Sequence, residues 1–83
     1  AEYQILYWCD IPAQIRVYEN GRPRSHKLPE RFQEEIDRVA MKEGLANTDE
    51  YLDQWIWSDR MRRDGEPEDV AAEVIRELVE GRA

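Results

Sequence analysis

Cys9 and His26 are the residues of this 83-residue chain whose types could together perform nucleophilic chemistry. A cysteine nucleophile needs a neighbouring base or a cationic pocket that stabilises its thiolate. Cys9 ends an alternating apolar run, and an unpaired cysteine is usually a small buried hydrophobe, so we expect Cys9 in the core. The alternative is a reactive thiol. His26 lies in the cationic stretch Arg24–Lys27, which predicts an exposed loop residue.

Metal and acid–base chemistry find little support in the sequence. One thiol and one imidazole fall short of the roughly four nitrogen or sulfur ligands of a zinc site, so we expect neither a metal nor a cofactor. A carboxylate dyad needs two carboxyl groups in one pocket, whereas the acidic runs here are typical of solvated helix faces and helix starts. We therefore expect no catalytic residues. The runs are Glu34, Glu35 and Asp37, and then Glu66, Glu68 and Asp69.

Basic residues form two clusters in a chain of net charge −7. Such acidity argues against binding nucleic acid, because phosphate contacts need a positive surface. The clusters balance the charge of an acidic domain or, alternatively, form a docking patch for an acidic partner or a phosphate group. We favour the former, and expect both clusters toward one end of the fold. They are Arg22, Arg24 and Lys27, and then Arg60, Arg62 and Arg63.

Length and composition indicate a single domain over residues 1–83. The hydrophobic fraction of 41% is normal for a folded protein. One cysteine cannot form an internal disulfide, which fits a reducing cytoplasm. Neither a signal-peptide pattern nor an apolar run of about 18 residues occurs, so we expect a cytoplasmic location and no membrane contact.

Three strands are predicted. Tyr3–Cys9 is the densest apolar and aromatic run, and we expect it to be the central strand, followed by an edge strand at Ala13–Glu19. Asn20-Gly21 is a turn signal, but Pro23 makes a further strand unattractive, so we expect residues 22–28 to leave the sheet. The third strand is Gln54–Ser58, where Trp55 and Trp57 share a core face.

Two helices complete the expected fold. The apolar spacing of Phe32, Ile36, Val39 and Ala40 predicts a helix over residues 29–43 that Gly44 ends as a left-handed cap. Asn47 or Thr48 could cap one helical turn, and a last helix begins near Pro67. The fold class is α+β, in the order β-β-α-β-α. The antiparallel sheet has the strand order 2-1-3, and both helices cover one face.

Five stretches, which together extend over nearly the whole chain, support a family resemblance. They are Tyr7–Gln14, Leu28–Gln33, Ile36–Asp37, Ala40–Met41 and Tyr51–Trp57. In these stretches the chain resembles the small bacterial domain called "virulence factor", which occurs alone or as the C-terminal part of a larger conserved virulence factor. The resemblance implies a compact bacterial domain, carries over no catalytic residues, and implies genomic company with one-carbon and corrinoid methyl-transfer genes.

We expect a non-enzymatic protein-interaction or accessory module that binds a protein partner or forms a homodimer through the helix-free sheet face. Alternatives are an accessory protein that handles a small ligand or cofactor in one-carbon or corrinoid metabolism, and an enzyme acting through Cys9. The surface assignment needs Tyr7 opposite Ile15, and hence a three-residue loop at Asp10–Pro12. In the rival assignment, Leu6 and Trp8 point inward. The expected surface is Leu6, Trp8, Arg16, Tyr18, Ile56 and Arg60, ringed by Gln4, Gln14, Gln54 and Ser58.

Overall fold

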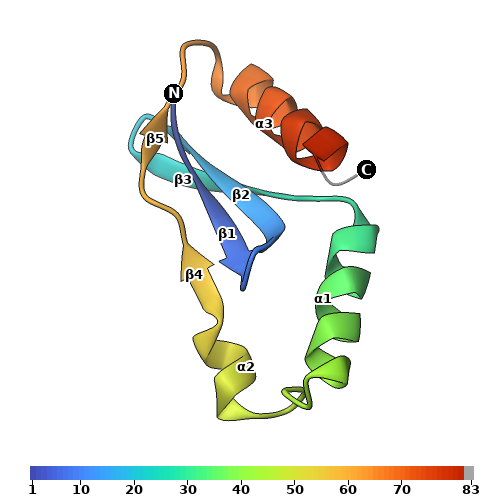
Figure 1. Cartoon of the computed structure of the whole chain (residues 1–83). Helices are drawn as coiled ribbons and strands as arrows, with labels where there is room; N and C mark the ends of the chain where they lie inside the picture. Colours follow the sequence, from blue (N-terminus) through green and yellow to red (C-terminus); the bar gives the residue numbers. More distant parts are fainter. Residues whose placement is uncertain (82–83) are drawn as a thin grey trace.

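The computed structural model describes residues 1–81 and shows an α+β fold with an antiparallel sheet and three helices (Figure 1). The last two residues of the expected domain lie outside the described residues. The elements in chain order are β1 (Glu2–Trp8), β2 (Ile11–Glu19), β3 (Arg22–Lys27), α1 (Glu30–Lys42), α2 (Asp49–Asp53), β4 (Trp55–Trp57), β5 (Met61–Arg62) and α3 (Pro67–Gly81).

The sheet keeps β1 at its centre, as its apolar character predicts. Over the described residues the strand order is β3-β2-β1-β4, and β5 also pairs with β1. The expected order 2-1-3 is therefore present as β2-β1-β4, with all pairings antiparallel. The three-strand count was wrong, since β3 and β5 were expected as loops.

β3 forms because the turn at Asn20-Gly21 is a hairpin turn. Both residues have positive φ, 51° and 81°, which is the geometry of a two-residue hairpin loop. Leu28 donates its N–H to Ala13 O at 3.2 Å. Because donors alternate between the two sides of an antiparallel strand, Pro23 directs its donorless nitrogen to the open edge. The proline therefore removes no ladder hydrogen bond, and its presence was not evidence against a strand.

β4 and β5 are two pieces of one interrupted strand along β1. Between them, Ser58 accepts a hydrogen bond from Ile5 N on its Oγ at 2.9 Å and donates its own N–H to Ile5 O at 2.8 Å. The serine side chain thus replaces a backbone acceptor. The charged segment after Ser58 consequently returns to the sheet, where Met61 lies opposite Tyr3.

The β1–β2 hairpin has a two-residue turn, Cys9–Asp10, and not the expected three-residue loop. Trp8 lies opposite Ile11, and the register shifts at Ala13, so that Leu6 lies opposite Gln14. The extra residue of this bulge restores the side-chain parity that a three-residue loop would have produced. The faces of β2 were therefore assigned correctly from an incorrect turn.

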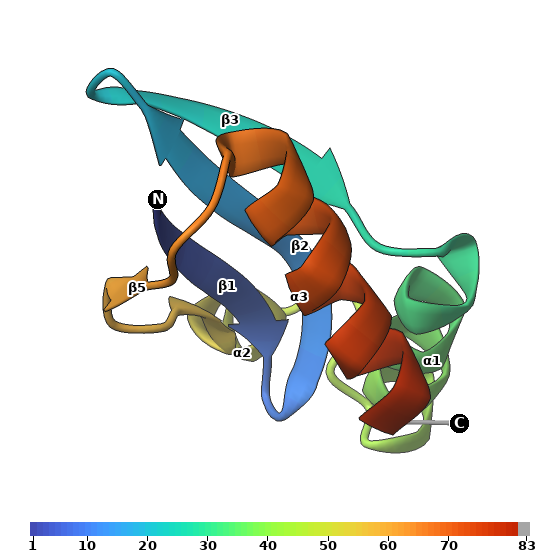
Figure 2. The same ribbon diagram turned by 90° about the horizontal axis from the view of Figure 1, so that it is seen from above.

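α3 covers one face of the sheet (Figure 2). On this face, alternate residues of the two central strands are no more than 7% exposed, as their periodicity predicts. The core under α3 consists of Tyr3, Ile5, Ile15 and Val17 from the sheet, with Val70, Ala71 and Val74 from the helix.

The opposite face is also covered where β1 ends, because α2 lies behind the sheet in the view of Figure 2. Trp8 is 0% exposed there. Its Nε1 donates to Tyr51 O at 2.9 Å, and the two rings lie 5.4 Å apart. The expectation of a helix-free face with Trp8 exposed on it was wrong, because α2 packs Tyr51 onto Trp8.

α1 buries three residues of the predicted stripe, Phe32, Ile36 and Ala40, and Val39 is half-buried. Gly44 follows it with φ 71°, and the amide of Leu45 donates to Ala40 O at 2.8 Å. This is the predicted Schellman arrangement, in which the glycine adopts a conformation that an L-residue adopts at a steric cost.

Arg63 connects α3 to the start of β1. The backbone of Arg63 exchanges hydrogen bonds with Ala1, and its guanidinium binds both carboxylate oxygens of Glu77 at 2.5 and 2.9 Å. The hydrogen bond from Arg63 lowers the pKa of Glu77 and raises that of Arg63. Arg63 thus has a structural role.

We predict that Trp8→Ala reduces the free energy of unfolding by about 3–5 kcal/mol, since it removes a fully buried indole and its hydrogen bond. Domains of this size have about 4–12 kcal/mol in total, so a quarter of the stability or more would be lost. Chemical denaturation measures the change. Trp57→Ala is the matched control, because Trp57 is only half-buried; an equal loss in both variants would contradict the assignment of Trp8 to the core.

We predict that Glu77→Gln flattens the acid limb of the stability curve. A lowered carboxyl pKa stabilises the fold fully above the ordinary value of 4.5, and this stabilisation disappears as the pH falls through the lowered pKa. Urea midpoints at pH 7 and below pH 4.5 should therefore differ less in this variant than in the parent protein. Glu73→Gln, on the exposed surface of the same helix, should leave the difference unchanged.

Candidate functional site

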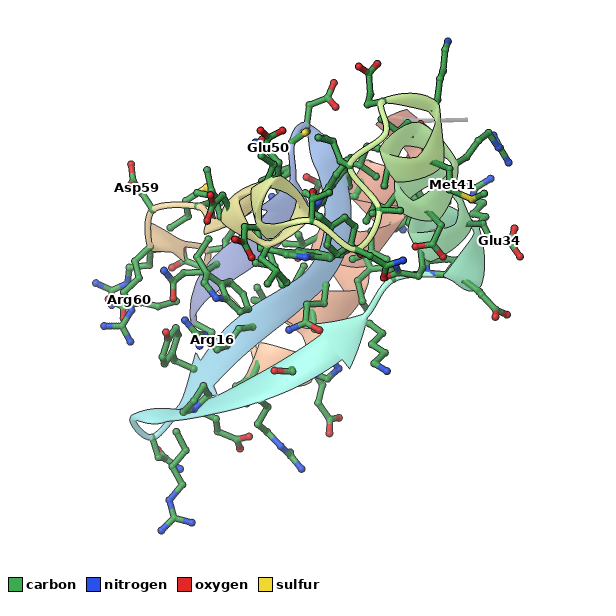
Figure 3. All side chains as sticks on the ribbon, turned by 90° about the horizontal axis from the view of Figure 1, so that it is seen from below. Arg16, Glu34, Met41, Glu50, Asp59 and Arg60 are labelled. Atoms are coloured by element: carbon green, nitrogen blue, oxygen red, sulfur yellow. The ribbon has the colours of Figure 1, made fainter. Side chains whose placement is uncertain are left out.

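The sheet face opposite α3 gathers polar and aromatic side chains from three strands. Gln4 lies opposite Arg16, and Leu6 lies opposite both Gln14 and Trp57. Residues that are opposed across a sheet share a face, and alternate residues of one strand do too. All of these side chains therefore lie on the face that α3 leaves uncovered, which is turned toward the viewer in Figure 3.

An arginine–aromatic cluster occupies this face and consists of Gln4, Arg16, Tyr18, Trp57 and Arg60. Arg16 places its guanidinium carbon 4.0 Å from the centre of the Trp57 ring. Its Nη2 donates to Gln4 Oε1 at 3.0 Å, and the Tyr18 hydroxyl donates to the same oxygen at 2.6 Å. The Gln4 amide in turn donates to Ser58 O at 3.0 Å. The cluster is thus held in one arrangement before any partner arrives.

Arg60 completes the cluster from the segment between β4 and β5. Its guanidinium carbon lies 3.8 Å from the centre of the Tyr18 ring, and its Nε lies 3.6 Å from Glu2 Oε2. The arginine side chain remains 52% exposed. Figure 3 shows Arg16 and Arg60 on the same face. Tyr18 therefore lies between two guanidinium groups, one more exposed than the other.

A hollow of about 400 Å³ adjoins the cluster where the sheet meets the start of α1. Leu6 and Trp55 supply its apolar side, and Lys27 supplies a cation. Its size falls within the range of about 300–1,000 Å³ of ligand pockets. The remaining lining residues are Ala13, Gln14, Leu28, Pro29, Glu30 and Gln33.

Four of the six expected surface residues lie on this face without being fully buried, namely Leu6, Arg16, Tyr18 and Arg60. Trp8 shares it by parity but is buried. Ile56 lies on the other face, because it is opposite Tyr7 and not opposite a residue of the Leu6 face. Of the expected rim, Gln4 lies inside the cluster, Gln14 lines the hollow, Ser58 serves the backbone, and Gln54 contacts the β1–β2 turn.

Trp57 is the residue of the cluster that the sequence reading missed. It was expected in the core with Trp55, whereas both are half-buried on the same face as Leu6. A shift of one residue in the β1–β4 register moves Ile56 to the face expected for the two tryptophans, and the tryptophans to the face expected for Ile56. The exposed Ile56 between two aromatic residues is an alternation signal, but it does not indicate which face is outward.

The basic clusters gather partly as expected. Arg22 and Arg24 in β3 lie toward the end of the sheet at which β5 places Arg62 opposite Glu2. Lys27 lies at the other end of β3, opposite Gln14. Arg24 contacts Glu19 at 3.5 Å. Arg63 binds Glu77, so Arg60 and Arg62 are the members of the second cluster on the uncovered sheet face.

Cys9 is not a core residue, contrary to expectation. It is exposed in the β1–β2 turn with φ 54°, and its thiol contacts Gln54 Oε1 at 3.4 Å. The strand alternation does not extend to Cys9 because the turn begins there. His26 is not in a loop either, since it is half-buried in β3 opposite Ile15.

Within residues 1–81, histidine, cysteine and acidic side chains form no group of three or more that could hold a metal ion. No helix in this part of the chain is long and apolar enough to cross a membrane.

A family model described as virulence factor matches residues 6–81 of the chain. The match covers almost the whole sequence, and the chain belongs to this family. No curated protein and no solved structure matches it significantly.

We predict that Cys9 is alkylated in the native protein, because its thiol is exposed and needs no unfolding to react. Iodoacetamide should modify it at a rate within about an order of magnitude of that in denaturant, since exposure controls access. Mass spectrometry follows the modification. If the protein had to unfold before it reacted, the native rate would be the denatured rate multiplied by the small equilibrium constant of unfolding. Such a rate would place the thiol in the interior and contradict the structure.

Proposed function

We propose that this member of the virulence factor family is a protein-interaction module that docks an acidic protein surface through the arginine–aromatic cluster. Arginine, tryptophan and tyrosine are the residues enriched at binding hot spots. The observation that carries the proposal is the stacking of Arg16 on Trp57 and of Arg60 on Tyr18, at 4.0 and 3.8 Å.

The proposed partner is acidic because the exposed charges on this face are mostly positive. Arg60 and Arg62 flank the cluster at one end, and Lys27 lies beside the hollow at the other. Glu2, which contacts Arg60, and Glu30, which lines the hollow, are the acidic residues beside them. Basic residues thus gather here although the whole chain carries −7. Electrostatic complementarity of this kind orients a partner and excludes wrongly charged surfaces.

Preorganisation supports a binding role over mere charge balance. The hydrogen bonds from Arg16 and Tyr18 to Gln4 fix the two side chains that a partner would meet. Side chains already fixed in the free protein lose less conformational entropy on binding. An arginine that only increases solubility has no need for such contacts.

The adjoining hollow supports a refinement of the same proposal. A partner whose acidic residues meet the arginines could insert an apolar side chain between Leu6 and Trp55. A buried anchor surrounded by polar contacts is the usual anatomy of a protein interface. The hollow equally fits a small ligand by size. An accessory role in handling such a ligand is therefore the second candidate function.

We predict that Arg60→Glu weakens partner binding by about tenfold or more, which corresponds to about 1.4 kcal/mol. The change removes a cation–π contact and reverses a charge that the partner should meet. A partner captured from the native host and then purified would be titrated by calorimetry at several salt concentrations. The dependence of affinity on salt should also become weaker.

Arg76→Glu is the matched control, since Arg76 is exposed on α3, which covers the other face. Its effect on affinity should be small. Equal losses in both variants would show that net charge alone drives binding. Unchanged partner affinity in both Arg60→Glu and Trp57→Ala would contradict the proposed surface. A small molecule that quenches the fluorescence of Trp55 without displacing a protein partner would favour the second candidate.

A further inference from the structure

A second surface depression lies between α1 and α2, away from the arginine–aromatic cluster. We define it as the α1–α2 groove, with a volume of about 640 Å³. Figure 3 labels Met41 on α1 and Glu50 on α2, the helices that form its two sides. Its lining consists of Asp37, Ala40, Met41, Ala46, Asn47, Thr48, Asp49, Tyr51 and Leu52.

Exposed apolar side chains form the two sides of the groove. Met41 is 74% exposed and Leu52 is 64% exposed. These are two of the three large hydrophobic residues that are exposed in residues 1–81, and the third, Ile56, lies outside the groove. Paired apolar walls of this kind mark a place where another apolar surface is buried. Methionine is also well suited to repacking against different partners.

The connection between the two helices holds the groove in shape. Gly44 and Asn47 have positive φ, and Thr48 contacts Leu45 O through both its backbone N–H and its Oγ1. Thr48 Oγ1 then accepts a hydrogen bond from Tyr51 N at 3.3 Å as the N-cap of α2. Beneath it, Tyr51 is fixed by Trp8. The groove is therefore preformed.

The charged residues that line the groove are acidic. Asp37 and Asp49 belong to its lining, and Glu50 and Asp53 are exposed on the same short helix. None of the described residues that line it is basic. An occupant should consequently carry positive charge beside its apolar groups, which is the opposite of the partner proposed for the sheet face.

The shape of the groove favours a polypeptide segment over a small molecule. A small ligand is usually buried over most of its surface, whereas the walls here are themselves mostly exposed. An amphipathic helix needs only an open trough that receives one apolar stripe, and its cationic residues can then reach the acidic rim.

We infer that the α1–α2 groove binds a basic amphipathic helix of a partner protein, with Met41 and Leu52 contacting its apolar stripe and Asp37 and Asp49 contacting its lysines or arginines. Together with the sheet face, this would give the domain two docking surfaces of opposite charge. The inference does not depend on the function proposed for the sheet face, because the groove shares no residue with the cluster.

The test uses fluorescein-labelled peptides of about 15 residues, long enough to form a helix on binding. One peptide carries leucine and lysine at helical spacing, a second replaces each lysine with glutamate, and a third has the residues of the first in scrambled order. Fluorescence anisotropy is measured with the full chain near physiological ionic strength. The basic amphipathic peptide should bind. The dissociation constants of the acidic and scrambled peptides should be higher by about tenfold or more.

Matched variants locate the binding. Met41→Ser with Leu52→Ser should weaken binding of the basic peptide by about tenfold or more, whereas Ile56→Ser, the same kind of change outside the groove, should not. Asp37→Asn should weaken it by severalfold, and Asp69→Asn on α3 should leave it unchanged. Arg60→Glu tests the sheet face and should not weaken this peptide. All substituted residues are exposed, and circular dichroism checks that each variant is folded.

Absence of binding by the basic amphipathic peptide would overturn the inference. Equal binding of the acidic peptide would overturn it too, because charge complementarity would then play no part, and equal binding of the scrambled peptide would show that the helical apolar stripe plays none. Equal losses in the groove variants and their controls would mean that the peptide does not bind in the groove. None of these results bears on the sheet face, which is tested through an acidic partner and through Arg60.

Discussion

The burial of Trp8 is the contact on which the arrangement of the other elements depends. Its ring is fully enclosed, and its Nε1–H is satisfied by the carbonyl of Tyr51, 43 residues away in the sequence. This one side chain brings the end of β1, the short helix α2 and the start of β4 together, because Tyr51 also meets Trp55 edge to face. Burying an indole without a partner for its N–H would be unfavourable, so α2 is held in position by polar as well as apolar contacts.

The sequence predicts those parts of the fold that local periodicity determines. The apolar spacing in α1, its glycine cap and the alternation in Tyr3 and Ile5 all have the expected outcome, because each reflects neighbours on the same element. β3 and β5 could not be read in this way. β3 consists mostly of exposed residues and therefore has no apolar alternation. Its Pro23 is tolerated only because the proline nitrogen faces the open edge of the sheet.

The candidate site is predictable to the same extent. Arg16 and Tyr18 were placed on the correct face because the bulge at Ala13 compensates for the shorter turn. Trp8 and Ile56 were misplaced because the first depends on a five-residue helix and the second on a long-range register. The α1–α2 groove left no signal in the sequence beyond two apolar residues, Met41 and Leu52, at positions where polar ones would be expected. Local patterns thus define faces, and only tertiary contacts decide what covers them.

The small size of α2 has a thermodynamic consequence. This helix has no buried residue and contacts Trp8 and Trp55 through Tyr51, so its backbone amides should exchange with solvent through local opening that costs less than global unfolding. Tyr51 lines the groove on one side and touches Trp55, which lines the hollow of the sheet face, on the other. A ligand that binds on one side of α2 and suppresses its local opening therefore also orders the residues on the other side. By linkage, any effect that an occupant of one surface has on the affinity of the other acts by the same factor in both directions.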